Sequence, residues 1–92
     1  MKRFVIVKYY EATDSNQNFK GEKQIWYCGK QGADCRVDGN EGTNYLNAFI
    51  NCYGYSTKSG AKKAFNCSKE LAEWETKAGH WKVSVELIEI NI

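Results

Sequence analysis

The sequence predicts a single α+β domain in which an antiparallel β-sheet of three to four strands packs against two helices. Segments rich in β-branched and aromatic residues flank two segments with helical spacing, strands and helices do not alternate, and there is no internal repeat. With 92 residues, the chain is long enough to bury one hydrophobic core without disulfides or metals. We therefore expect residues 1–92 to form one domain with the order β-β-(β)-α-α-β.

The first strands are predicted from composition. Residues 3–11 are β-branched and aromatic without helical spacing, which indicates a central strand covered on both faces for part of its length. After a polar, turn-rich stretch the chain extends again at residues 24–28, so the two segments predict a wide hairpin. Residues 34–38 alternate polar with apolar side chains, as a short half-buried strand does.

The last strand has the clearest pattern in the chain. Trp81, Val83, Val85 and Leu87 alternate with polar residues, and we expect this apolar face to form part of the main core. The phase changes at Leu87 and Ile88, which predicts a bulge or a change of face there. The first and last strands are the most apolar elements, so we expect them to pair.

Two helices are predicted between these strands. The first carries an apolar face and ends at Gly54, which suits a left-handed C-terminal position. Its apolar residues are Tyr45, Leu46, Phe49, Ile50 and Tyr53. The second begins after Thr57 and ends at Gly79, and Asn66-Cys67-Ser68 leaves open a kink or break. The residues expected on its inward face are Ala61, Ala64, Phe65, Ser68, Leu71 and Ala72.

Composition and charge exclude several classes of protein. The apolar share of 42%, with 14% aromatic residues, argues against disorder. A net charge of +2, from 13 basic and 11 acidic residues, is too balanced for binding nucleic acid by bulk charge alone. The apolar run at residues 4–7 is too short for a signal peptide or a membrane span, so we expect a cytoplasmic protein with no membrane partner.

Metal binding and catalysis have no convincing residue set. The gaps between Cys28, Cys35, Cys52 and Cys67 are 6, 16 and 14 residues, unlike the close pairs of zinc sites. We expect four reduced thiols, each a small core hydrophobe, and no metal or cofactor. His80 is the only histidine and precedes a strand, which is typical of a turn residue. We therefore expect no enzymatic activity.

A lysine corner stands out at the start of the second helix. Lys58, Lys62 and Lys63 lie where the helix dipole is already positive, while acidic residues lie at the other end. One interpretation is a solvated, charge-segregated face. Another is an anion-binding corner in which Tyr53 and Tyr55 stack bases while the lysines hold phosphates. The same five residues could equally form an aromatic-rich protein interface.

Aromatic, lysine and alanine residues mark residues 53–58, Ala61-Lys62-Lys63-Ala64 and Trp81, which opens the last strand, together with the strand at residues 4–11 and Trp26-Tyr27. In these positions the chain resembles small uncharacterised proteins of bacteriophages and prophages. The resemblance covers most of the chain and brings no catalytic residues. It implies a phage or mobile-element origin, where compact α+β proteins of this size often bind and block a host protein, including components of CRISPR defence.

The sequence thus favours a non-enzymatic binding protein that acts on a host protein or nucleoprotein complex. The alternative is a nucleic-acid-binding accessory protein that uses Lys58, Lys62 and Lys63. The expected binding residues are these three lysines with Tyr53 and Tyr55. The sequence leaves open whether two copies pair through an exposed strand edge.

Overall fold

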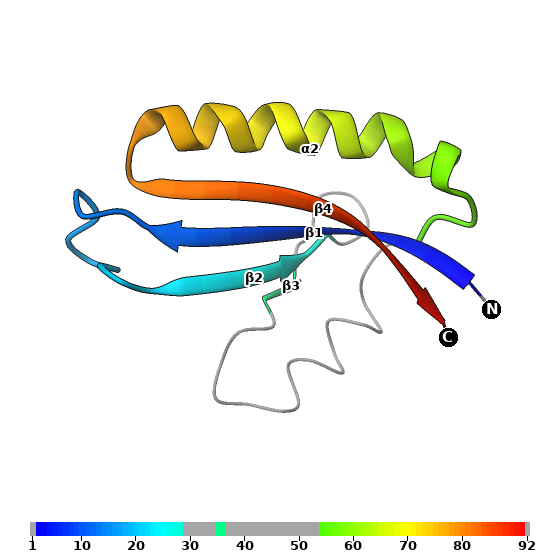
Figure 1. Ribbon diagram of the computed structural model, residues 1–92, viewed down its shortest axis with the longest axis horizontal. Helices are drawn as coiled ribbons and strands as arrows, with labels where there is room; N and C mark the ends of the chain where they lie inside the picture. The colour runs from blue at the N-terminus through cyan, green and yellow to red at the C-terminus, as the bar shows by residue number, and fades with distance from the viewer. Residues whose placement is uncertain (1, 29–34, 37–53, 92) are drawn as a thin grey trace.

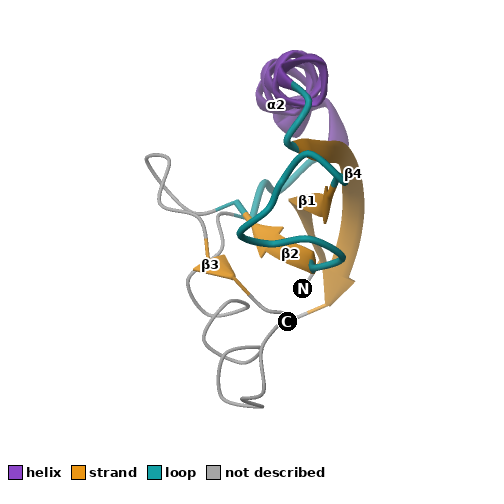
Figure 2. Ribbon diagram, turned by 90° about the vertical axis from the view of Figure 1, so that its left-hand side faces the viewer, coloured by secondary structure: helices purple, strands orange, loops and turns teal. Residues whose placement is uncertain are grey.

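The computed structural model describes residues 2–28, 35–36 and 54–91, which form an antiparallel sheet with a long helix on one face (Figure 1). The elements are β1 (Lys2–Ala12), β2 (Lys23–Tyr27), β3 (Cys35–Arg36), α2 (Lys58–Ala78) and β4 (Trp81–Asn91). The sheet order is β3-β2-β1-β4, and all neighbouring strands are antiparallel (Figure 2). The predicted α+β class with an antiparallel sheet is confirmed. The predicted first helix, residues 45–53, lies outside the described residues.

The pairing of β1 with β4 is the longest in the sheet. It runs from Lys2 opposite Asn91 to Ala12 opposite Trp81 without a break. The predictions that the first strand is central and that it pairs with the last strand are therefore confirmed. The predicted bulge at Leu87 and Ile88 is wrong, because the register passes through both residues unchanged.

The two faces of the sheet carry different apolar layers. Directly paired residues of antiparallel strands project to the same face, and successive residues alternate. One cluster of buried residues lies on the face opposite α2, whereas the buried Ile6 and Val83 lie on the face toward α2. The apolar residues of β4 change phase because both faces of this strand are covered. The cluster consists of Val5, Val7 and Tyr27, with the partly buried Tyr9, Ile25, Ile88 and Ile90 packed against it.

The face toward α2 is less completely buried than the sequence predicted. Val83 is buried, whereas Trp81 and Val85 are half-buried. The expectation that these three residues form part of the main core holds fully only for Val83. The helix is tied to this face by polar contacts, since Thr76 Oγ1 accepts from Val83 N at 2.9 Å. Tyr10 Oη also donates to Glu75 Oε1 at 3.3 Å.

Helix α2 begins and ends as its sequence predicts. Thr57 caps the start, where its hydroxyl oxygen accepts from Gly60 N at 3.0 Å. Gly79 adopts the left-handed conformation at the end, with φ of 93°. The helix is continuous through Asn66 and Cys67. Both side chains are exposed and disturb no packing there, and the chain contains no proline that could kink the helix.

The buried residues of α2 are both alanines. Ala61 and Ala72 are buried, while Ala64, Phe65 and Ser68 are half-buried. The assignment of Leu71 to this inward face is wrong, because its side chain is 56% exposed. Successive helical residues differ by about 100° in direction, so the position before Ala72 falls on the flank of the helix.

Glycine at position 54 has a different role from the one predicted. The left-handed residues among the described glycines are Gly21 and Gly79. At Gly54, a Cβ atom would lie 3.0 Å from the Cβ of Arg3, which is tighter than most contacts of this kind and would require the Arg3 side chain to shift. Glycine therefore permits close approach of this segment to β1.

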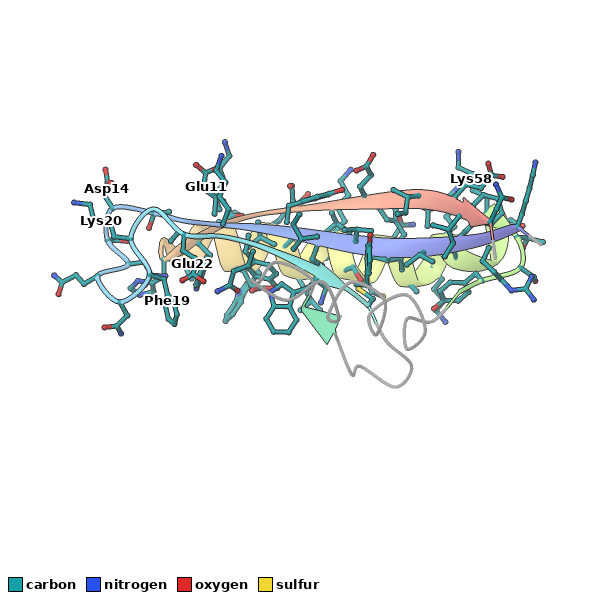
Figure 3. The ribbon with its side chains drawn as sticks, turned by 90° about the horizontal axis from the view of Figure 1, so that it is seen from below. Glu11, Asp14, Phe19, Lys20, Glu22 and Lys58 are labelled. Atoms are coloured by element: carbon teal, nitrogen blue, oxygen red, sulfur yellow. The ribbon has the colours of Figure 1, made fainter. Side chains whose placement is uncertain are left out.

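The polar segment after β1 fastens the turn between α2 and β4. Asn16 is buried, and its Nδ2 donates to the carbonyl of His80 at 3.1 Å while its Oδ1 accepts from Phe19 N at 3.2 Å. The hydroxyls of Thr13 and Ser15 both donate to the Gly79 carbonyl. Phe19 lies at this end of the molecule and Lys58 at the other (Figure 3).

Candidate functional site

The lysine corner lies where α2 passes over β4. Lys58 and Lys62 are one helical turn apart and line a groove of about 750 Å³. Half-buried apolar side chains from both elements, Phe65, Val85 and Leu87, also line it. The remaining lining residues are Ser59, Asn66 and Glu86. The groove thus combines an apolar surface with two cations.

Lys63 belongs to a different surface. It lies about 100° around the helix from Lys62, and it lines a separate hollow with Asn66, Cys67 and Glu70. Lys62 and Ser59 border both the groove and this hollow. The anion-binding interpretation expected the three lysines to converge on one ligand position. They do not, because Lys58 and Lys63 line different hollows.

The two tyrosines predicted beside the lysines have different outcomes. Tyr55 is half-buried and forms an isolated antiparallel bridge with Phe4, in which each backbone N–H donates to the other residue's carbonyl, at 2.9 and 2.8 Å. This bridge fixes the chain just before α2 begins. Tyr53 lies outside the described residues.

The N-terminus of α2 is capped by the side chain of Thr57. The Thr57 hydroxyl accepts from the N–H of Gly60, so one of the free donors that would bind an anion is occupied. The first turn contains no acidic residue. Its positive dipole end is therefore not offset by a carboxylate within the helix.

Glu86 borders the groove but is held toward the opposite face of the sheet. Its Oε2 accepts from the hydroxyl of Tyr9 at 2.9 Å, and Tyr9 belongs to the cluster on the face away from α2. Burial, followed by the hydrogen bond and the negative charge of Glu86, raises the pKa of Tyr9 above its usual value of 10.0.

A second surface, which the sequence reading missed, runs along the other flank of α2. Leu71 is 56% exposed and Trp74 is 71% exposed. With Cys67 and Glu70 they line a shallow hollow of about 610 Å³. Cys67, Leu71 and Trp74 are spaced at i, i+4 and i+7, a helical stripe separate from the buried line. This spacing is the sequence feature that could have predicted the surface.

The described cysteines differ from the prediction. Cys28 is half-buried, but Cys67 is exposed, so its assignment as a core hydrophobe is wrong. It lies on the Leu71–Trp74 flank, which the helix turns away from the sheet. The Cys35 side chain and Cys52 lie outside the described residues.

Within residues 2–28, 35–36 and 54–91, no group of three or more metal-ligating side chains could hold an ion. Across the same residues, no helix has the length and apolar character needed to cross a membrane. The chain matches no protein-family model, no curated protein and no solved structure. The surfaces of α2 and β4 are therefore the basis for a proposed function.

Proposed function

We propose that this protein is a non-enzymatic binding protein that occupies a surface of a macromolecular partner. The observation that carries the proposal is the exposure of Leu71 and Trp74 side by side on α2. Tryptophan is among the residue types that dominate binding energy when buried at an interface. Neighbouring apolar side chains left in water favour an interaction surface over a bare helix face.

The resemblance to phage proteins suggests the kind of partner. A phage-encoded protein of this type would bind a host protein or nucleoprotein complex, such as a component of CRISPR defence, and block it. Blocking requires only tight, specific occupancy, which agrees with the absence of a catalytic residue set in the sequence.

Affinity capture tests the proposal. The purified chain is used as bait in a lysate of candidate host bacteria, beside Leu71→Ala/Trp74→Ala and a control, Glu73→Ala/Lys77→Ala, that changes exposed residues of the same helix. We expect the parent and the control to retain a discrete partner that the first variant loses. Equal retention by all three proteins would contradict a role for this flank.

Nucleic-acid binding is the second candidate. It is favoured by Lys58, Lys62 and Lys63 at the start of α2, with no acidic residue in the first turn. The separation of Lys63 from the groove and the Thr57 cap weaken it. Salt-dependent titration, described in the Discussion, separates it from the first candidate.

A further inference from the structure

Strand β4 forms the end of the sheet in the described part of the chain. It pairs with β1 along its whole length, and no described strand lies on its other side. With 11 residues it is long for an edge strand, and its register has no bulge. Proteins usually protect such edges with short strands, prolines or bulges, because unpaired N–H and C=O groups accept a further strand.

The groove beside the lysines extends to this edge. It is lined by Val85, Glu86 and Leu87, which are consecutive and project alternately to the two faces of the sheet. Because side chains from both faces of the strand line the groove, the groove extends around the outer edge of β4. No β1 residue lines it, so it lies on the flank of α2 away from Tyr10, the β1 residue that contacts Glu75.

The charges around the groove select one kind of ligand. Lys58 and Lys62 border it from α2, and Lys58 is exposed at the far end of the molecule from Phe19 (Figure 3). Two carboxylates of β4 are already engaged across the sheet, Glu86 by Tyr9 and Glu89 by Lys2 at 3.6 Å. We propose that the outer edge of β4 binds an extended acidic segment of a partner protein, which adds to the sheet as a further strand.

Strand addition explains both parts of the surface. The ladder of backbone hydrogen bonds supplies affinity, and the side chains that project toward α2 supply specificity. Apolar side chains of the added strand pack on Phe65, Val85 and Leu87, while its acidic side chains meet Lys58 and Lys62.

A second copy of the chain fits this edge poorly. Two β4 strands related by a two-fold axis would run antiparallel and place both α2 helices on the same face. Helix α2 packs chiefly over β4. The two helices would then lie over strands about 4.8 Å apart, whereas packed helices need roughly 8 to 10 Å. Lys58 and Lys62 would also face their own counterparts.

This inference rests on the proposed function and adds a named surface and partner chemistry to it. Its test uses synthetic peptides and the intact chain, independently of the capture experiment on Leu71 and Trp74. One short peptide alternates valine and glutamate, and its partner alternates valine and lysine. Binding is followed by the chemical shifts and hydrogen exchange of the backbone amides.

We expect the valine–glutamate peptide to bind and to slow exchange at the amides of β4 that face away from β1, except that of Val83, which already donates to Thr76. Lys58→Glu/Lys62→Glu should weaken this binding about tenfold or more and favour the valine–lysine peptide instead. Lys63→Glu is the control, because it reverses one lysine of the same helix outside the groove, where the test variant reverses two within it. Acidic residues near the helix start favour the dipole, so these variants remain folded.

The inference is overturned if neither peptide binds at millimolar concentration, if both bind equally, or if Lys63→Glu weakens binding as much as the double variant. Loss of the captured partner in Leu71→Ala/Trp74→Ala, with no effect of these charge reversals on peptide binding, would leave the proposed function standing without the β4 surface.

Discussion

Tyr9 in β1 donates a hydrogen bond of 2.9 Å from its hydroxyl to Oε2 of Glu86 in β4. The two residues are diagonal neighbours on the face of the sheet opposite α2, because Glu86 lies directly across from Val7. This bond joins the packed cluster of that face to the strand that borders the groove.

The first prediction concerns the ionisation of Tyr9. Burial, the hydrogen bond to Glu86 and its charge all raise the pKa of Tyr9 above 10.0, so the difference between ultraviolet titrations of the parent and Tyr9→Phe should show an ionisation above pH 10.0. Glu86→Gln should lower this pKa while leaving the part caused by burial. Because the folded pKa is raised, stability is full below the unfolded pKa and falls as pH rises through the folded value. In Tyr9→Phe, the unfolding free energy measured with denaturant should lose this contribution to its decrease at alkaline pH.

The second prediction compares valines on the two faces of the sheet. Val7 is 1% exposed within the buried cluster, whereas Val85 is half-buried beside the groove. Val7→Ala should therefore cost about 2 to 3 kcal/mol of unfolding free energy and Val85→Ala about 1 kcal/mol. Denaturant unfolding measures both. The reverse order would place the principal core beneath α2.

The third prediction concerns Asn16, which holds the turn between α2 and β4. Asn16→Ala should cost about 1 to 3 kcal/mol, because it leaves the His80 carbonyl and the Phe19 N–H without these partners. Asn18→Ala, at an exposed position of the same segment, should leave the unfolding free energy nearly unchanged. Equal losses of unfolding free energy in the two variants would show that the hydrogen bonds of Asn16 are not the cause.

The fourth prediction is that the four cysteines are reduced and bind no metal. Their wide spacing in the sequence is the reason. Thiol titration of the unfolded protein should find four free groups, and elemental analysis should find no stoichiometric zinc. Unfolding of the protein by a chelator would reveal a ligand set assembled from distant segments.

The fifth prediction tests the nucleic-acid alternative through Lys58, Lys62 and Lys63. We expect weak binding to single-stranded and duplex nucleic acid, with a dissociation constant no tighter than about 10⁻⁴ to 10⁻⁶ M, because the net charge of +2 is small. The double variant Lys62→Ala/Lys63→Ala is compared with the parent at two salt concentrations. If phosphates are bound, each lost lysine should reduce the log–log salt slope by roughly one. Salt-sensitive nanomolar binding that the double variant abolishes would favour nucleic acid over protein.

The strands could be predicted from sequence because their signals are local. The composition of β1 and the alternation in β4 identify both, and their apolar character was sufficient to predict their pairing. The same local pattern left two alternatives open at Leu87 and Ile88. Their change of phase predicted either a bulge or a change of face, and the second is what the structure shows, because both faces of β4 carry packed side chains.

The surfaces could be predicted less well because they depend on helix orientation and packing. The buried residues of α2 are Ala61 and Ala72, whose weak hydrophobicity does not fix the inward direction. Leu71 was therefore assigned inward. Lys58, Lys62 and Lys63 are neighbours in sequence, yet about 100° of rotation separates Lys63 from Lys62. The groove itself exists only because β4 passes beneath the first turns of α2.

The pairing of β1 with β4 also bears on how the chain folds. Residues 13–80 separate the two strands, yet these strands form the longest ladder in the sheet. During synthesis, β1 leaves the ribosome long before its principal neighbour exists, and among the described strands it can pair with β2 in the meantime. Closing this loop loses chain entropy before the hydrogen bonds between the two strands can form. Folding should therefore be slow for a domain of this size. Until β4 arrives, both the edge of β1 and its buried valines remain open to other chains, which makes this interval the one in which aggregation threatens most.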